Sequence, residues 1–439
     1  RQMCIRDRGE AALTSDEVTV LVAVFVEDFD DNFLDPNLWT AQSGEDTSVD
    51  ETNRRLEFTI QATAHGDVFG SDISSRCKVK GDFDIQVDFD LFDWPARNGV
   101  RTALVAHEGV ERSDRGNHSP YGGYYAAWFG SAGLVDTSDM SGTLRLVRNG
   151  DTYYGYYRPP NTDQWHLIAS ESGLDTGNTG FGLNSWSDDD WFGDVYVQAA
   201  FDDLIVLTGQ FICAQLTPDR SDAARAGTVV AYTHVLTNTG SSTDTFDITH
   251  HSSQGWPVNY ATPITLAPYE TATVVVTVTV PADTISGTLE TTIVTATSQT
   301  DADIVASVAD TTTVTFTPGA ALSPDRSGAV KPGESAVYTH TLTNNGNGAQ
   351  SFTLAASSAA GFTVTVAPQA TGPLAPLGGS VVVTVTVTAP ADALSGTLDT
   401  AVVTATGSLG GVDTVRDTTA VFTEAEEHFI YLPLVLRDR

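Results

Sequence analysis

Two stretches in the second half of the chain alternate between valine and threonine. Residues 271–280 spell TATVVVTVTV and residues 380–388 spell SVVVTVTVT. Successive side chains of a β-strand point to opposite faces, so this pattern places valines on one face and threonines on the other. We therefore predict strands that are buried on one side and exposed to water on the other.

These stretches belong to a repeat of about a hundred residues. Tyr232-Thr-His-Val-Leu-Thr-Asn238 returns as Tyr338-Thr-His-Thr-Leu-Thr-Asn344, an offset of 106 (338 − 232). The offset grows to 109 where 281–289 returns as 390–398, so the later copy has gained residues near 369–372. A loop would absorb such an insertion. The repeat indicates two modules of one design, at 211–318 and 319–423.

Each module is expected to be an immunoglobulin-like β-sandwich. Strand-like runs are punctuated by turn residues such as Asn238-Thr-Gly240 and Asn344-Asn-Gly346, which tolerate positive φ. The repeated Tyr-Thr-His-x-Leu-Thr-Asn-x-Gly pattern resembles bacterial extracellular Ig-like repeats of the NEW3 type. That resemblance implies a spacer or stalk and transfers no catalytic residue.

The first half, 27–210, differs in composition. It holds six of the seven tryptophans, and its predicted strands are separated by no long stretch at helical spacing. These strands cover 56–61, 83–92, 100–107, 121–129, 144–148, 165–170 and 195–206. We predict one all-β domain.

Three segments of this half resemble the concanavalin A-like lectin/glucanase superfamily, in particular laminin-G-type and DUF1349-type domains. They are the opening 27–39 (EDFDDNFLDPNLW), the middle 144–165 and the closing 201–206 (FDDLIV). The resemblance implies a jelly-roll β-sandwich and a structural core role for Trp39 and Trp165. Because lectins, glycosidases and adhesive modules share that fold, it leaves the activity open.

Charge and cysteine content narrow the class of protein further. With 56 acidic and 22 basic residues the net charge is −34, which disfavours nucleic acid and anionic lipid as partners. No apolar run is long enough to span a membrane. The three cysteines do not make a disulfide scaffold; Cys77 and Cys213 either pair or remain buried thiols.

The two ends of the chain are set apart from the domains. Residues 1–26 are interpreted as a non-native remnant (RQMCIRDR) with the lead-in to the first strand, and a signal peptide is expected upstream. The tail 424–439 contains FIYLPLVL and resembles endings of exported bacterial proteins. It is expected either to attach the protein to the cell envelope or to dock as a strand on the last module.

The sequence disfavours catalysis. Hydrolysis of a glycosidic bond needs two carboxylates, which the glucanases of this superfamily carry as Glu-x-Asp-x-x-Glu on one strand. The acidic strand here, Asp82-Phe-Asp-Ile-Gln-Val-Asp-Phe-Asp90, has no glutamate, and its aspartates alternate with apolar residues as the wet face of a half-buried strand. We therefore predict no catalytic residue.

Aromatic side chains are the candidates for ligand contact, because sugar rings stack on them while polar neighbours bond the hydroxyls. Trp186 and Trp191 flank an acidic stretch that gives them little packing. Alternation places Tyr124 and Trp128 on one face, opposite Tyr125 and Phe129, without deciding which face is the core. The predicted ligand-binding residues are Trp186, Trp191, Trp128, Tyr124, Tyr154 and Tyr156.

Clustered aspartates suggest a structural calcium ion. Hard carboxylate oxygens suit calcium, and sandwiches of this kind place the first and last strands side by side. The predicted ligands are Asp28, Asp30, Asp202 and Asp203. The alternative is that these acids are solvated and cap a strand end.

Together these features predict an exported, non-catalytic surface protein. Its head would recognise a glycan or a cell-surface polysaccharide and would be presented on an Ig-like stalk. Two alternatives stay open: a glycosidase with dispersed acids, and a purely structural adhesin or surface-layer component.

Overall fold

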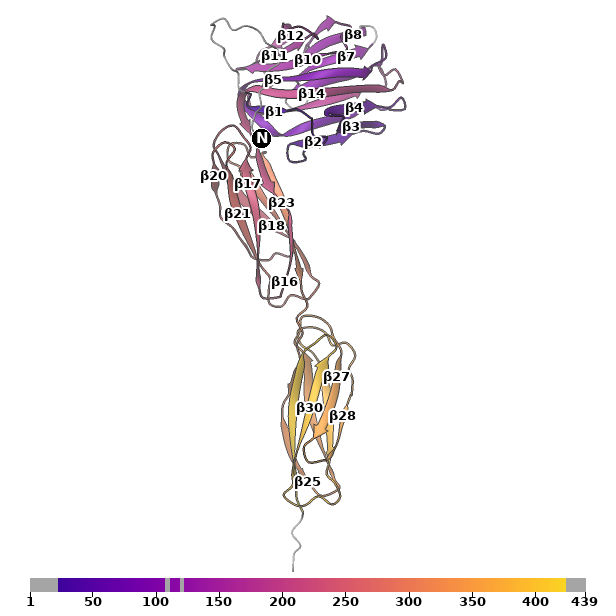
Figure 1. Ribbon diagram of the computed structural model, residues 1–439, viewed down its shortest axis with the longest axis vertical. Helices are drawn as coiled ribbons and strands as arrows, with labels where there is room; N and C mark the ends of the chain where they lie inside the picture. The colour runs from indigo at the N-terminus through magenta and orange to yellow at the C-terminus, as the bar shows by residue number, and fades with distance from the viewer. Residues whose placement is uncertain (1–22, 107–110, 119–121, 424–439) are drawn as a thin grey trace, which may run out of the picture.

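The computed structural model describes residues 23–106, 111–118 and 122–423. All regular elements in these ranges are β-strands, arranged as three bodies in a row along the long axis (Figure 1). The predicted fold class, a jelly-roll β-sandwich followed by two immunoglobulin-like β-sandwiches, is confirmed. Residues 1–22 of the predicted leader and the whole tail 424–439 lie outside the described residues. No helix capable of crossing a membrane is found in the described part.

The head is a sandwich of two sheets that share one long strand, β5 (Phe69–Asp93). The first part of β5 pairs with β13 and the second part with β10, and the strand passes between the layers around Gly81, whose φ is 77°. A positive φ at this crossing favours glycine.

We call the two layers the cleft sheet and the back sheet. The cleft sheet contains β2 (Trp39–Ser43), the first part of β5, β13 (Thr179–Ser187), β6 (Arg101–Ala106), β7 (Glu111–His118), β8 (Gly122–Trp128) and β9 (Ala132–Asp136). The back sheet contains β3 (Thr47–Thr52), β4 (Arg55–Ile60), β14 (Val197–Ile212), the second part of β5, β10 (Ser141–Asn149), β11 (Thr152–Arg158) and β12 (His166–Glu171). Strand β1 (Phe25–Glu27) pairs with the later part of β14.

The core of the head lies between these two sheets. Tyr125 and Phe129 are buried there, so the opposite face of β8, which carries Tyr124 and Trp128, is the outer one. Trp39 is also in the core, as predicted. Trp165 is not: it lies half-buried on the outside of the back sheet, where the guanidinium groups of two arginines cover its ring.

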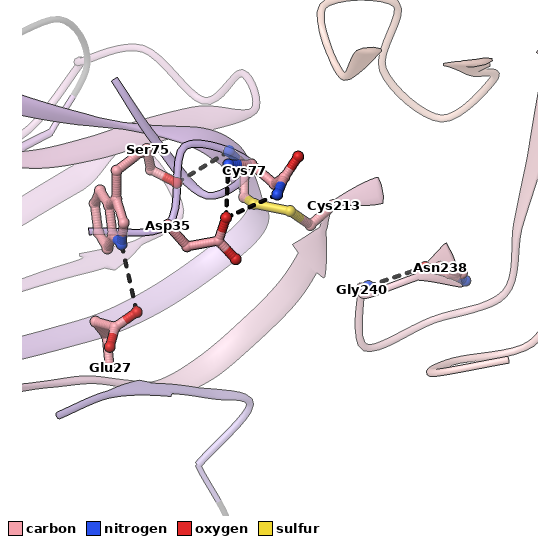
Figure 2. The surroundings of a disulfide bond; sticks show 9 residues. Glu27, Asp35, Ser75, Cys77, Cys213, Asn238 and Gly240 are labelled. Carbon is pink, nitrogen blue, oxygen red and sulfur yellow. Dashed lines mark hydrogen bonds between the residues drawn. A yellow bond between two sulfur atoms is a disulfide. The ribbon is translucent and has the colours of Figure 1, made fainter. Parts of the chain in front are cut away.

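The chain passes from the head into the first module without a linker. Phe211 and Cys213 belong to the head core, whereas Ile212 and Ala214 belong to the core of the first module. Alternate side chains of this one extended segment therefore pack into the core of the head and into the core of the first module. The disulfide between Cys77 and Cys213 lies at this boundary, with a Cα–Cα distance of 4.7 Å (Figure 2).

Each module is a sandwich of two sheets. In the first module one sheet holds β15 (Ala214–Thr217), β17 (Val229–Asn238), β21 (Thr271–Thr279) and β19 (Val258–Asn259), and the other holds β16 (Arg220–Ala224), β23 (Val305–Val314), β22 (Leu289–Ser298), β18 (Asp244–Ser252) and β20 (Ile264–Leu266). In the second module one sheet holds β24 (Ala321–Ser323), β26 (Ser335–Asn344), β29 (Gly379–Thr388) and β28 (Thr363–Ala367). The other sheet holds β25 (Arg326–Val330), β31 (Val412–Val421), β30 (Leu398–Gly407) and β27 (Phe352–Ser358). The predicted insertion at 369–372 lies between β28 and β29, outside the strands.

The alternating stretches pack as predicted. Val274, Val276 and Val278 on β21 are buried, as are their counterparts on β29, Val383, Val385 and Val387. The side chains between them, Val275 and Thr277 on β21 and Thr384 and Thr386 on β29, lie on the outer faces. Apolar burial on one face therefore holds each module together without an internal disulfide.

The repeated Tyr-Thr-His-x-Leu-Thr-Asn-x-Gly sequence encodes a buried polar network. In the first module, His234 contacts the Pro218 carbonyl through Nδ1 at 2.9 Å and Asp310 through Nε2 at 3.0 Å. The Asn238 side chain accepts a hydrogen bond from the Gly240 N–H. A Cβ on Gly240 would lie 2.6 Å from the Phe211 carbonyl, so this position requires glycine. The second module has the same contacts at His340, Asn344 and Gly346.

Candidate binding cleft

A cleft of about 1040 Å³ lies on the outer face of the cleft sheet. Its floor is formed by the outward side chains of β5, β13 and β6, and Arg112 of β7 borders it. Residues 303–305 of the first module, where β23 begins, form part of its wall. The cleft is therefore built by the head and the first module together.

Strand register sets the order of the polar side chains on this floor. Asp72 of β5 pairs with Asn184 of β13, Asn184 with Ala103 of β6, and Ala103 with Asp114 of β7. Residues paired across strands lie on the same face of a sheet. Of this row, the Asp72 carboxylate and the Asn184 amide line the cleft, while Ala103 and Asp114 are buried beside it.

A ladder in which tryptophan rings alternate with arginine guanidinium groups runs beside this row. The Arg112 guanidinium lies 5.5 Å from the ring centroids of both Trp128 and Trp186, and Arg101 lies 4.4 Å from that of Trp186. Cation–π contacts of this kind fix planar side chains in a defined orientation. The ladder connects β8, β7, β13 and β6, and Trp186 and Arg112 line the cleft.

Three buried polar atoms on this face have no hydrogen-bond partner among the described residues. They are Oδ1 of Asn184, Oδ1 of Asp114 and Nη1 of Arg101. The Arg101 guanidinium also interacts with the Tyr124 hydroxyl, and its Nη1 lies 3.6 Å from Asp188. Burying a polar atom without a partner costs about 1–3 kcal/mol, so these three atoms are expected to take a polar partner, either water or a ligand.

Burial also perturbs the ionisable groups of this face. It raises the pKa of Asp114, an effect that Arg112 and Arg101 oppose, and it raises the pKa of Asp72. Burial raises the pKa of Tyr124 to about 12, so its hydroxyl stays protonated at neutral pH. The face therefore offers carboxylate and amide acceptors next to arginine donors.

The structure brings three of the predicted ligand-binding residues to this face and separates the others. Trp186, Trp128 and Tyr124 stand on the outer side of the cleft sheet. Trp186 belongs to β13 and is partly covered by two arginines, so the prediction that it has little packing is wrong. Trp191 is 41% exposed and lies in the turn that follows β13.

Tyr154 and Tyr156 lie on the opposite outer face of the head. They belong to β11, which pairs with β10 in the back sheet, and their rings stack at 6.3 Å. Nearby, the guanidinium groups of Arg145 and Arg158 lie 4.9 and 5.0 Å from the Trp165 ring. These tyrosines therefore cannot share a site with Trp186, because the core of the head separates the two faces.

The predicted calcium ligands lie near one another, but the Arg54 guanidinium lies among them. Strand β1 does pair with β14, which confirms that the first and last strands lie side by side. However, Asp30 forms an ion pair with Arg54 at 2.8 Å, and Oδ1 of Asp202 accepts the Asp203 N–H. In the described ranges, no group of three or more His, Cys, Asp and Glu side chains could hold a metal ion. Asp28, Asp30, Asp202 and Asp203 thus form no calcium ligand set.

Sequence reasoning missed most of the polar residues of the cleft. Arg101 and Arg112 carried no distinguishing signal, and β13 was not predicted, so the role of Asn184 was missed. Alternation within the predicted strand 100–107 could have placed Arg101, Ala103 and Val105 on one face. The contribution of 303–305 had no local signal in the sequence.

Comparison with known proteins matches parts of this chain. Residues 7–107 match the family model of a protein of unknown function, the DUF1583 C domain, and residues 321–421 match the model of the VWA7 Ig-like domain. No curated protein matches the chain.

Similar solved structures align with about two fifths of the chain. One of them is titled "Prominent members of the human gut microbiota express endo-acting O-glycanases to initiate mucin breakdown". It has 12% identity to this chain, covers 42% of this chain and 99% of its own, and has a TM-score of 0.34. The Emp47p carbohydrate recognition domain has 11% identity, 44% and 100% coverage and a TM-score of 0.32. LamAcat from Zobellia galactanivorans has 13% identity, 42% and 97% coverage and a TM-score of 0.32.

Proposed function

We propose that the head binds a glycan in the cleft and does not cleave it. The observation that carries this proposal is the Trp128–Arg112–Trp186–Arg101 ladder beside the unpartnered oxygens of Asn184 and Asp114. A sugar ring presents C–H faces and hydroxyl groups at once. Indole rings accommodate the former, while carboxylate, amide and guanidinium groups bond the latter.

The spacing of the carboxylates supports binding without hydrolysis. Asp72 and Asp114 are in register on β5 and β7, with β13 and β6 between them. Three strand spacings separate their backbones by about 14 Å. Glycosidases need carboxyl groups roughly 5 to 10 Å apart across the scissile bond. This spacing does not suit acid–base chemistry across one bond, and Asp72 is the carboxylate that lines the cleft.

The rest of the chain is proposed to act as a stalk outside the cell. The disulfide at the head boundary is suited to an oxidising compartment. The junction between the modules is also held by direct bonds: Asn347 accepts the Thr317 N–H through Oδ1 and donates to the carbonyls of Thr284 and Thr315. Such junctions keep a head at a fixed distance from an anchor, and we propose that the tail 424–439 provides that attachment.

A glycan array probed with the full chain tests the proposal. Trp186→Ala is the test variant, and Trp165→Ala is its matched control, since both tryptophans are flanked by two arginines but lie on opposite sheets. We expect binding that Trp186→Ala abolishes and Trp165→Ala preserves, with the same signal in calcium and in chelator. Absence of binding to every glycan would favour a purely structural adhesin, and release of shortened sugars would favour a glycosidase.

A further inference from the structure

One end of the cleft is closed by the first Ig-like module. The cleft runs along β13 from Trp186 to Gly180, a length of about 20 Å for six residue steps along a strand. Gly180 pairs with Lys78 near the start of β13. Residues 303–305 of the first module line the cleft together with Lys78.

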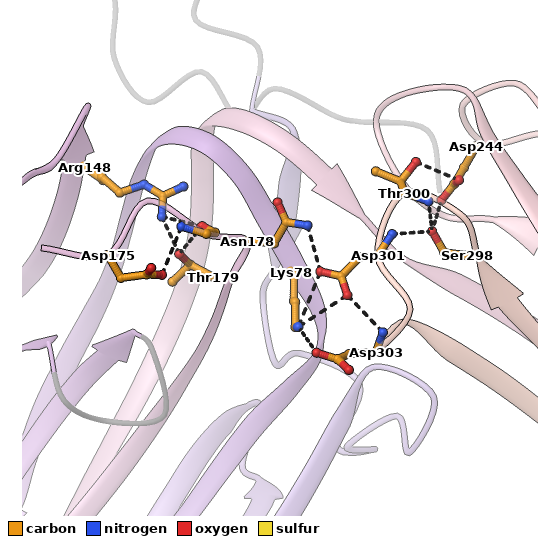
Figure 3. Close-up of polar contacts among 11 residues, drawn as sticks. Lys78, Arg148, Asp175, Asn178, Thr179, Asp244, Ser298, Thr300, Asp301 and Asp303 are labelled. Atoms are coloured by element: carbon orange, nitrogen blue, oxygen red, sulfur yellow. Dashed lines mark hydrogen bonds and ion pairs between the residues drawn. The ribbon is translucent and has the colours of Figure 1, made fainter.

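This wall is fixed by bonds between the two domains. Nζ of Lys78 contacts Asp303 at 2.5 Å and Asp301 at 3.4 Å, and Asn178 donates to Asp301 at 2.8 Å (Figure 3). The Cys77–Cys213 disulfide lies next to Lys78 in the sequence. The Asp301 carboxylate is largely buried, while Asp303 remains exposed toward the cleft. A ligand therefore meets a wall that several contacts hold in place.

From this geometry we propose that the cleft accepts the end of a glycan chain and not an internal segment. The inference rests on the proposed function and specifies its ligand. A polysaccharide lying along β13 would have to continue past Lys78, where 303–305 stand. A chain that terminates at Lys78 meets no such obstacle, and its terminal hydroxyl groups face the Lys78 and Asp303 charges.

Counting chain ends tests this inference on the full chain. The probes are linear β-glucan, β-xylan, β-mannan and α-glucan, each intact and each shortened by limited acid hydrolysis, compared at equal mass. If the protein binds chain ends, the amount of protein bound per unit mass of glycan rises in proportion to the number of glycan chains. A capacity that follows total mass overturns the inference but leaves glycan binding intact. Binding to no probe and to no glycan on the array overturns the proposed function and the inference with it.

A change in the wall gives a second, independent measurement. The double variant Asp303→Gly/Val305→Gly removes the side chains that close the cleft, and Val412→Gly is the control. Val412 begins β31 of the second module as Val305 begins β23 of the first, and both are exposed. We expect the double variant to gain binding to intact polysaccharide while the control does not. Unchanged selectivity for ends in the double variant would contradict the role of the wall.

Discussion

Nζ of Lys78 lies 2.5 Å from Oδ2 of Asp303, an ion pair that joins the head to the first module across 225 residues of sequence. Lys78 also neutralises Asp301, the more buried of the two aspartates. The charge contacts that position the module beside the cleft therefore depend on one lysine side chain.

Replacing that lysine should weaken the fold in a pH-dependent way. Burial alone would raise the pKa of Asp301, but hydrogen bonds from Asn178 and the Asp303 N–H, together with Lys78, lower it below its usual value. A lowered carboxyl pKa stabilises the fold above the unfolded pKa, and this stabilisation is lost as pH falls. We expect Lys78→Met to cost about 1–3 kcal/mol at pH 7 and less at pH 3.

Urea denaturation at the two pH values measures this difference. Lys80→Met, two residues further along β5 and exposed, is the control and should leave stability unchanged. An equal loss at pH 7 and pH 3 would show that the effect of Lys78→Met comes from lost packing and not from the charge on Asp301.

The disulfide at the domain boundary should contribute strongly to the stability of the head. It closes a loop with a sequence separation of 136 and both sulfur atoms belong to the head core. Removing a native disulfide typically costs about 2–5 kcal/mol. We expect Cys77→Ala/Cys213→Ala to lower the free energy of unfolding by that amount, measured by guanidinium denaturation. If reductant leaves the midpoint of the wild-type protein unchanged, the bond contributes little.

The histidines of the two modules should stabilise the buried aspartates that they contact. Nδ1 of His340 faces the Pro324 carbonyl and Nε2 faces Asp417, and both partners accept hydrogen bonds. Burial raises the pKa of Asp417 and His340 lowers it. Loss of the histidine therefore leaves a buried carboxylate, whose cost grows as pH rises above the usual aspartate range.

We expect His340→Gln to destabilise the second module by about 3–5 kcal/mol at pH 7, and by less at pH 4. Thermal unfolding by calorimetry at both pH values measures this effect. His251→Gln, an exposed histidine on β18, is the control. A destabilisation that is larger at pH 4 than at pH 7 would contradict the proposed effect of His340 on the Asp417 carboxylate.

The modules show how much of this fold the sequence predicts. Alternation at 271–280 and 380–388 gives both strands and their buried faces, because each strand packs on one side only. In the head, β13 and β7 were not predicted. Their sequences, TGFGLNSWS and ERSDRGNH, carry glycine and charge where a strand is usually apolar, and their neighbours in the middle of the sheet impose the conformation.

The candidate site was predicted only in part for the same reason. Alternation gave the shared face of Tyr124 and Trp128, since both belong to one strand. It could not show that Trp186 joins them, because that depends on the register of β13 against β6. It also placed Tyr154 and Tyr156 among the ligand residues, because composition alone does not distinguish the two outer faces of a sandwich.

The acids around β1 give a further pH prediction. Burial, followed by the neighbouring Asp31 and Glu27 carboxylates, raises the pKa of Glu51 to about 7, against an opposing backbone bond from Phe33. A raised carboxyl pKa means that the folded state binds more protons than the unfolded state, so stability falls as pH rises from about 4.5 to about 7. Glu51→Gln should therefore stabilise the head at pH 8 by on the order of 1 kcal/mol and change little at pH 4. Melting curves at pH 8 and pH 4 measure this difference. Equal shifts of the melting temperature at both pH values would show that the effect of Glu51→Gln comes from packing and not from the carboxylate charge.

The most direct test of glycan binding in the cleft is calorimetric titration of the full chain with the glycan that gives the strongest array signal. The wild type, Trp186→Ala and Trp165→Ala are compared. We predict that Trp186→Ala weakens the affinity at least tenfold, about 1.4 kcal/mol, while Trp165→Ala leaves it unchanged. An affinity that survives Trp186→Ala, or that falls equally in both variants, would contradict the account.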